Sequence, residues 1–164
     1  MKSSDKVLIG IVVGIIILVI VALVITLTRP EPTYIPDDTP KGVVHNYLLA
    51  LQREDYEKAY GYLSPTVYHY PSSTQQFKTI VEANSYRFRM GTEVSISVDD
   101  ATISGKNATV EVTESRFYGG DLFDSGQSAY TFSMDLQLKG NDWKIVKSYY
   151  YFANCWTNRN SKCY

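Results

Sequence analysis

Histidine and cysteine are scarce in this chain, and the sequence motifs of common enzymes are missing. Its 164 residues include two histidines and two cysteines. There is no G-x-S-x-G nucleophile elbow, no phosphate-binding P-loop and no G-x-G-x-x-G fingerprint. Two cysteines with no histidine nearby make a poor metal site. The sequence therefore predicts no metal, no cofactor and no catalytic residue.

A basic excess is also lacking. Beyond Leu27 the acidic residues outnumber the basic ones, 16 to 14. A protein that binds DNA or RNA needs a basic face that releases counterions from the phosphates. Nucleic acid is therefore not an expected partner.

What the chain does have is one long apolar run near its start. From Val7 to Leu27 there are 21 uncharged residues, and 17 of them are Val, Ile or Leu. A helix of this length covers the roughly 30 Å hydrocarbon core of a bilayer. The sequence predicts a transmembrane helix over residues 7–28. A cleaved signal peptide is the alternative, but its apolar region is usually only about 7 to 15 residues long and ends in small residues.

The residues that flank this helix suggest its orientation. Lys2 and Lys6 lie in a short leader, residues 1–6, whereas three acids follow soon after Arg29. Because positive residues are enriched on the cytoplasmic side, we expect a single-pass protein of the cell membrane with its N-terminus in the cytoplasm. The C-terminal domain is then extracytoplasmic.

Gly10 and Gly14 form a G-x-x-x-G step within the predicted membrane helix. Such a step lets two helix backbones approach closely, so this pair is a helix-packing candidate that would allow a homodimer. Two glycines tolerated in a lipid-facing helix are the alternative.

Residues 29–40, RPEPTYIPDDTP, contain four prolines and predict an extended linker before the domain. A domain over residues 41–154 follows, and it starts with helical patterns. Apolar residues between Lys41 and Arg53 recur at the spacing of one helix face. Asp55 can cap a second helix that ends before Pro65, and Ser73 with Gln76 forms a capping box for a third.

After Gly91 the apolar period changes from that of a helix to the two-residue period of a strand. The predicted strands cover residues 94–98, 108–113, 128–138 and 143–152, with turns at 104–107 and 140–142. Helices followed by strands indicate an α+β fold with the helices on one face of an antiparallel sheet. We thus expect a transmembrane helix followed by three helices and a curved sheet of four to five strands.

Three segments give this order a family resemblance: Val43–Leu51, Asp55–Tyr60 leading to Leu63-Ser64-Pro65, and Gly140–Val146. The chain resembles a membrane-anchored member of the nuclear transport factor 2-like superfamily, a cystatin-like α+β cone. That resemblance implies a cone that can enclose a pocket. Some members are enzymes similar to ketosteroid isomerase, scytalone dehydratase or polyketide cyclases. Others bind ligands or partners, or resemble scaffold subunits of bacterial secretion machines, so the fold alone does not select a function.

Catalysis in isomerase-type members needs a buried carboxylate base opposite acidic hydrogen-bond donors. By position no residue of this chain matches that set. Asp135 shares its strand face with polar residues and is expected in solvent, His45 lies beside the apolar stripe of the first helix, and His69 falls in a loop. The sequence therefore favours binding over catalysis.

Aromatic residues are the candidates for such binding, since the chain contains 14 tyrosines. Rings on an exposed face suit recognition of sugars, wall polymers or proteins, although large side chains also fill the core of a small domain. The glycine-rich loop 117–126 could form a rim. The predicted pocket or rim residues are Tyr60, Tyr118, Phe123, Tyr130, Met134, Trp143 and Tyr149.

The two cysteines, Cys155 and Cys163, lie in the predicted tail, residues 155–164. In an oxidising compartment they can pair, and closing so short a loop stabilises by roughly 2 to 3 kcal/mol. Two free thiols are the alternative.

Three functions follow from these observations. The leading one is a membrane-anchored extracytoplasmic binding or assembly module without catalytic activity, whose partner is a small apolar ligand, a wall polymer or a protein. The second is a small-molecule enzyme of the isomerase or dehydratase kind, and the third is a scaffold subunit of an envelope or secretion complex.

Overall fold

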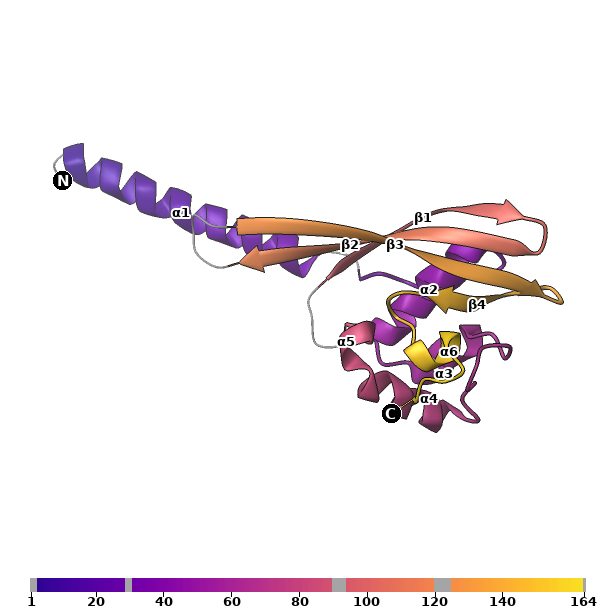
Figure 1. The fold of residues 1–164 in the computed structure, drawn as a ribbon. Coiled ribbons are helices and arrows are strands. Elements are labelled where there is room, and N and C mark those ends of the chain that lie inside the picture. The colour runs from indigo at the N-terminus through magenta and orange to yellow at the C-terminus, as the bar shows by residue number, and fades with distance from the viewer. Residues whose placement is uncertain (1–2, 29–30, 90–93, 120–124, 164) are drawn as a thin grey trace. The chain divides into compact units, whose positions relative to one another are not determined.

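The computed structural model describes residues 3–28, 31–89, 94–119 and 125–163, and the chain divides into two units, Met1–Thr33 and Tyr34–Tyr164 (Figure 1). The first unit is one helix, α1 (Ser3–Leu27). Its apolar side chains from Val7 onward are exposed. Within the described residues it is the one helix that is long and apolar enough to cross a membrane.

The second unit begins with helices, two of which have the N-cap residues that the sequence predicted. They are α2 (Pro40–Gln52), α3 (Tyr56–Tyr62), α4 (Thr74–Ala83) and α5 (Ser85–Phe88). The Asp55 carboxylate accepts the N–H of Lys58 at 3.2 Å, and the Ser73 hydroxyl accepts the N–H of Gln76 at 3.2 Å. The three predicted helices are confirmed, and α5 and the C-terminal α6 (Asn154–Thr157) add two short ones.

The chain then forms an antiparallel sheet in the simple order β1-β2-β3-β4. Its strands are β1 (Ser95–Ser104), β2 (Asn107–Gly119), β3 (Ser125–Lys139) and β4 (Asp142–Ser148). Gly105 and Gly140 occupy the two predicted turns with positive φ, which glycine adopts without a steric penalty. The helices gather beneath one face of this sheet (Figure 1), so the predicted α+β class is confirmed.

The prediction for the last strand was wrong at its end. We expected it to run from Trp143 to Phe152, but β4 stops at Ser148 and the chain bends over residues 149–152. Tyr151 lies in the left-handed region with φ 55°, and its N–H donates to the carbonyl of Arg87 at 2.9 Å. The backbone at this point therefore bonds to the end of the helical layer instead of to β3.

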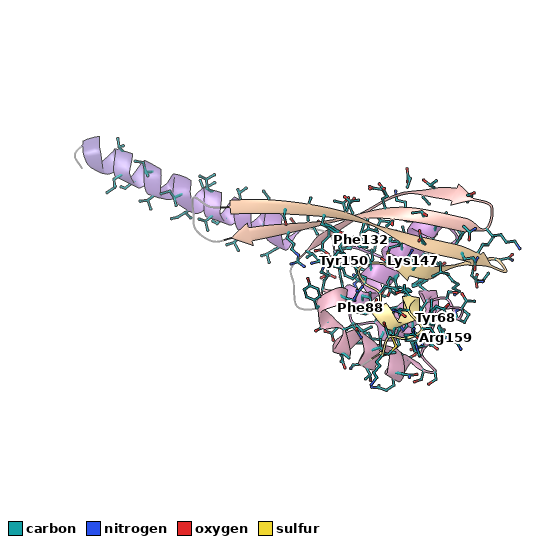
Figure 2. All side chains as sticks on the ribbon, viewed as in Figure 1. Tyr68, Phe88, Phe132, Lys147, Tyr150 and Arg159 are labelled. Atoms are coloured by element: carbon teal, nitrogen blue, oxygen red, sulfur yellow. A yellow bond between two sulfur atoms is a disulfide. The ribbon has the colours of Figure 1, made fainter. Side chains whose placement is uncertain are left out.

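Apolar side chains fill the space between the sheet and the helices. Tyr47 and Leu48 of α2 face Val110, Met134 and other buried residues of the sheet. A second cluster surrounds Trp156 of α6, which stacks on Phe77 and meets Phe88 and Phe152 edge-on. In Figure 2 Phe132 of β3 and Tyr150 of the bend lie side by side, and their ring centroids are 5.6 Å apart.

Cys155 and Cys163 are joined by a disulfide that ties the end of the chain to α6. At the other end of the unit, part of the predicted linker lies against α2. The side-chain amide of Asn46, which is 2% exposed, donates to the carbonyl of Ile35 and accepts its N–H. The Tyr34 hydroxyl donates to Asp55, the cap of α3.

Candidate functional site

The charged site of this fold is built around Glu114, an acid on the inner face of the sheet. Along β2 the side chains of Ala108, Val110 and Val112 are buried, and Glu114 continues that row with only 2% of its surface exposed. A carboxylate removed from water is costly unless cations and hydrogen-bond donors replace the solvent. Its partners therefore define the site.

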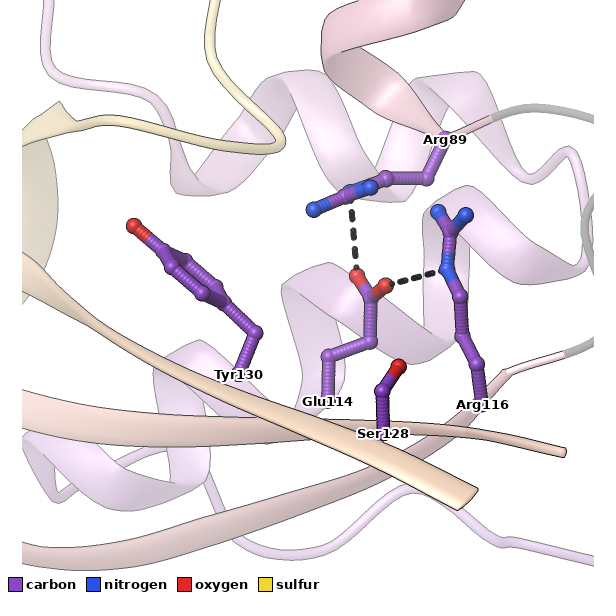
Figure 3. Close-up of a pocket in the computed structure, with 5 residues that line it drawn as sticks. All are labelled: Arg89, Glu114, Arg116, Ser128 and Tyr130. Carbon is purple, nitrogen blue, oxygen red and sulfur yellow. Dashed lines mark hydrogen bonds and ion pairs between the residues drawn. The ribbon is translucent and has the colours of Figure 1, made fainter. Parts of the chain in front are cut away.

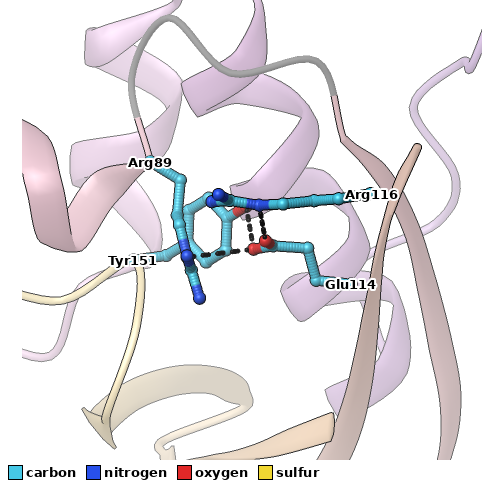
Figure 4. A network of polar contacts seen from close by, with 4 residues as sticks. All are labelled: Arg89, Glu114, Arg116 and Tyr151. Carbon is cyan, nitrogen blue, oxygen red and sulfur yellow. Dashed lines mark hydrogen bonds and ion pairs between the residues drawn. The ribbon is translucent and has the colours of Figure 1, made fainter. Parts of the chain in front are cut away.

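Three side chains from three segments contact the Glu114 carboxylate (Figure 4). Nε of Arg116 donates to Oε1 at 2.9 Å. Nε of Arg89 forms an ion pair with Oε2 at 3.2 Å, and the hydroxyl of Tyr151 donates to the same oxygen at 2.9 Å. Arg116 belongs to β2, Arg89 follows α5, and Tyr151 lies in the bend after β4. The carboxylate thus joins the sheet, the helical layer and the bend.

Two of these partners have an unfavourable backbone conformation. Arg89 has φ 56° and Tyr151 has φ 55°, and a residue with a side chain pays roughly 1 kcal/mol or more in this region. The carbonyl of Tyr151 is held by the hydroxyl of Tyr47 at 2.6 Å. At Arg89 this conformation ends α5, which is a common way for a helix to end. Glu54 and His69, which lie away from this site, share the left-handed conformation.

An aromatic wall adjoins the charged cluster. The guanidinium of Arg89 lies 3.9 Å from the centre of the Tyr150 ring. Tyr150 in turn meets Tyr130 edge-on, with centroids 5.2 Å apart, and Tyr130 is the partner of Glu114 in the sheet register. Cation and rings therefore form one continuous surface.

A cavity of about 140 Å³ opens beside this cluster. Figure 3 shows the five side chains that line it: Arg89, Glu114, Arg116, Ser128 and Tyr130. Two guanidinium groups and one carboxylate give these five residues a net charge of +1. The cavity therefore combines positive charge, two hydroxyl groups and one aromatic face.

Burial raises the pKa of Tyr151, and the negative charge of Glu114 raises it further, while Arg89 and Arg116 act in the opposite direction. The phenol therefore keeps its proton at neutral pH and acts as a donor to Glu114. Since both oxygens of Glu114 already accept from these donors, the carboxylate is poorly placed to take a proton from a substrate.

Neither histidine lines this cavity. His69 lies in a loop, and its Nε2 is 2.8 Å from the carbonyl of Arg159. Over the described ranges no group of three or more His, Cys, Asp or Glu could hold a metal ion.

The predicted pocket residues do not lie together. Tyr130 lines the cavity, and Tyr149 is exposed beside Tyr150. Met134 and Trp143 are buried in the core, while the Tyr60 ring stacks on Tyr70. The side chain of Tyr118 and the whole of Phe123 lie outside the described residues.

Sequence reasoning missed Glu114, Arg89, Arg116 and Tyr151. One signal was available, because Glu114 follows Ala108, Val110 and Val112 at the two-residue period that marks the buried face. A charged residue at such a position demands a buried partner. No comparable pattern pointed to Arg89 or Tyr151.

We predict that Glu114→Ala destabilises the folded unit by about 3 kcal/mol, because it leaves the largely buried Arg89 without its carboxylate. The matched control is Glu111→Ala, which removes an exposed acid from the same strand and should change stability by less than about 0.5 kcal/mol. Urea unfolding of the full chain in detergent micelles measures both. Equal effects of the two substitutions would contradict the assigned role.

A second prediction concerns alkaline pH. The folded state keeps the Tyr151 proton where the unfolded chain loses it, so the free energy of unfolding should fall as pH rises above about 10. Tyr151→Phe removes this term and should lessen the fall by up to about 1.4 kcal/mol per pH unit. Tyr86→Phe, at a tyrosine that is 82% exposed, is the control. Identical pH profiles of the two variants would contradict burial of this phenol.

No protein-family model and no curated protein sequence matches this chain. Solved structures that resemble it include a SEC-C motif protein from Rhodopseudomonas palustris. The two sequences are 12% identical, the match covers 70% of this chain and 80% of the other, and the TM-score is 0.47. A protein with a ketosteroid isomerase-like fold from Catenulispora acidiphila, solved with trimethylamine, is 15% identical to this chain. The match covers 71% of this chain and 88% of the other, with a TM-score of 0.42. A nuclear transport factor 2-like protein from Streptomyces avermitilis is 15% identical. That match covers 63% of this chain and 86% of the other, with a TM-score of 0.41. Likenesses this distant do not indicate a function.

Proposed function

We propose that this chain is a membrane-anchored binding module that holds a small ligand in the cavity beside Glu114 without transforming it. One observation carries the proposal. Both oxygens of a buried carboxylate are occupied by donors, one from β2 itself and two from other segments, while an open cavity remains next to them. This is the arrangement of a preformed recognition site, because the carboxylate that lines it is already engaged.

The anchor is part of the proposal. Helix α1 exposes Val, Ile and Leu side chains all along the span Val7–Ile25, and its length matches the hydrocarbon core of a bilayer. The disulfide between Cys155 and Cys163 supports an extracytoplasmic position for the folded unit, since such bonds persist in oxidising compartments. The N-terminus would then lie in the cytoplasm.

The desolvation cost of the buried charges supports the binding role. A site that served stability alone would gain more from an apolar replacement of the same volume, since buried ion pairs seldom outweigh their desolvation cost. Here the chain keeps two arginines and a carboxylate together despite that cost. Retention of such a cluster is expected where the charged groups recognise something.

An enzyme is the second candidate, and one observation favours it. Isomerases of the ketosteroid type place a buried acid opposite tyrosine donors, and this cavity contains Glu114 with Tyr130 on its wall and Tyr151 behind it. The role of base would require Glu114 to release Arg116 or Arg89 when a substrate enters. Turnover that disappears in Glu114→Gln would establish this reading.

The membrane anchor predicts that the full chain resists extraction by alkaline carbonate. Ile16→Lys with Ile20→Lys should release it, because each charge near the centre of the helix opposes insertion by about 3 kcal/mol. Ile16→Leu with Ile20→Leu is the control and should stay in the membrane. Mass spectrometry of the mature protein decides against a signal peptide if residues 1–28 are present. Their removal would overturn the anchor.

Binding is tested with three ring compounds of similar size: benzoate, benzyl alcohol and benzylammonium. At a concentration of 100 times its dissociation constant, a probe that fits should stabilise the full chain in micelles by about 2.7 kcal/mol and be recovered unchanged. Ser128→Leu fills the cavity and should abolish the effect. Ala129→Leu, at the exposed neighbouring position, should not. Stabilisation by none of the probes would overturn the binding role, and a reaction product would establish the enzyme.

A further inference from the structure

We infer that the first half of β3 is an interaction surface at which two copies of this chain pair edge to edge. This surface is the β3 edge, residues 125–133, along which β3 has no β4 neighbour. The inference goes beyond the proposed binding role and does not depend on it. It rests on the orientation of the backbone, on the protection of the other sheet edges, and on the charge and length of this segment.

The β3 edge presents backbone groups on the side away from β2. The carbonyl of Ser133 accepts the hydroxyl of Ser148 from β4, so Ser133 points away from β2. Orientation alternates along a strand, and the pairing with β2 is unbroken from Gly119 and Ser125 onward, so Ala129 and Thr131 share it. In Figure 1 the hairpin of β2 and β3 extends past the end of β4. No strand of the described ranges pairs with that side.

The bend after β4 makes its backbone hydrogen bonds elsewhere. The carbonyl of Tyr149 accepts from the side chain of Arg87, and the N–H of Tyr151 donates to the carbonyl of Arg87. These groups therefore bond to the helical layer. The ring of Tyr150 contacts β3, but it does so through Phe132 and its neighbour on the inner face.

The two other edges of the sheet are protected. On β1 a bulge between Val98 and Ala101 interrupts the pairing, and it contains two consecutive aspartates, residues 99–100. At β4 the N–H of Ser64 donates to the carbonyl of Ile145 at 2.9 Å, so the segment after α3 covers that edge. Bulges, charges and covering segments are the means by which native sheets prevent pairing at their edges.

The β3 edge lacks these devices. Residues 125–134 read SGQSAYTFSM and contain no charge and no proline. Their register with β2 runs without a bulge. A long, regular and uncharged edge is a template for pairing with another strand.

A second copy of this chain is the occupant that the segment fits. When a strand pairs with itself, every charge near the centre faces a like charge, which is destabilising, and the β3 edge avoids this along its whole length. Antiparallel pairing centred on Ala129 places Ser125 opposite Ser133 of the second copy. The two strands then overlap over residues 125–133 and stop where β4 begins, at Met134. The full edge is used without displacing β4.

The same register covers an exposed aromatic ring. Tyr130 is 47% exposed in the single chain. With the centre at Ala129, Tyr130 lies opposite Ser128 of the second copy and diagonal to the second copy's own Tyr130. Diagonal neighbours in a sheet are within reach of aromatic side chains. The two rings can therefore contact each other across the interface.

The experiment measures the dimer of the full chain in neutral detergent micelles by sedimentation equilibrium. Every sample carries Gly10→Leu and Gly14→Leu, so that close packing of α1 helices does not contribute. Ala129→Lys places like charges opposite each other and should raise the dissociation constant of the dimer by about fivefold or more. Ser115→Lys is the matched control, because Ser115 is the register partner of Ala129 on β2, one strand away from the edge. It should change the constant by no more than about twofold.

Ala129→Pro tests the backbone directly. The N–H of Ala129 points away from β2, so proline removes a donor to the second copy and leaves the pairing with β2 in place. Each copy loses one hydrogen bond worth about 1 kcal/mol, so the dissociation constant should rise by about tenfold or more. Near-UV circular dichroism verifies that each variant is folded.

Cross-linking locates the contact. Both native cysteines are in the disulfide, so Ala129→Cys supplies the one free thiol. A short bismaleimide should join two copies of this variant. Thr102→Cys is the control, since its thiol lies on β1 at the opposite edge of the sheet, and it should not be joined.

Three outcomes would overturn the inference. The first is a chain that stays monomeric with the two leucines in α1. The second is an equal dissociation constant for Ala129→Lys and Ser115→Lys, which would assign the dimer to another surface. The third is equal cross-linking of the two thiols. A dimer that is weakened by Ala129→Lys and Ala129→Pro, and joined through residue 129 alone, would establish the β3 edge as the interface.

Discussion

A carboxylate that leaves water loses several kcal/mol of solvation, and this loss has to be offset by whatever surrounds it. At Glu114 the compensation comes from the end of α5, from the bend after β4 and from β2 itself. Two of the donors, Arg89 and Tyr151, have a left-handed backbone. The position of the helical layer relative to the sheet is thus coupled to one buried negative charge.

The lengths of the strands explain why the cavity forms at this place. Strand β4 pairs only with the part of β3 from Met134 onward, so the first half of β3 has no β4 neighbour. The inward row of β2 and β3 changes there from apolar to polar, at the pair Glu114 and Tyr130. The bend after Ser148 lies beside the part of β3 that does not pair with β4, and it places Tyr150 and Tyr151 there. The cavity itself is bounded by β2, β3 and the end of α5, and the bend lies behind this lining.

Most of the fold could be predicted because its signals are local. Helix faces, the caps at Asp55 and Ser73 and the turns at Gly105 and Gly140 each depend on a few neighbouring residues. The end of β4 could not, because the backbone of Tyr151 is bound by residues far away in the sequence. The site divides in the same way. The two-residue period of buried side chains along β2 predicts that Glu114 faces inward. Its partners are distant in the sequence, and only the folded structure identifies them.

Glu114 neutralises one of the two cations beside it, and it also holds both of them in place. A free arginine side chain carries about 2 kcal/mol of rotamer entropy, which a ligand would have to remove on binding. Glu114 and the Tyr150 ring already fix Arg89, and Glu114 fixes Arg116. In the proposed binding site, part of that entropic cost would be met on folding, and the guanidinium groups would meet a ligand preorganised. The role proposed for this buried acid is therefore to hold the cations in place.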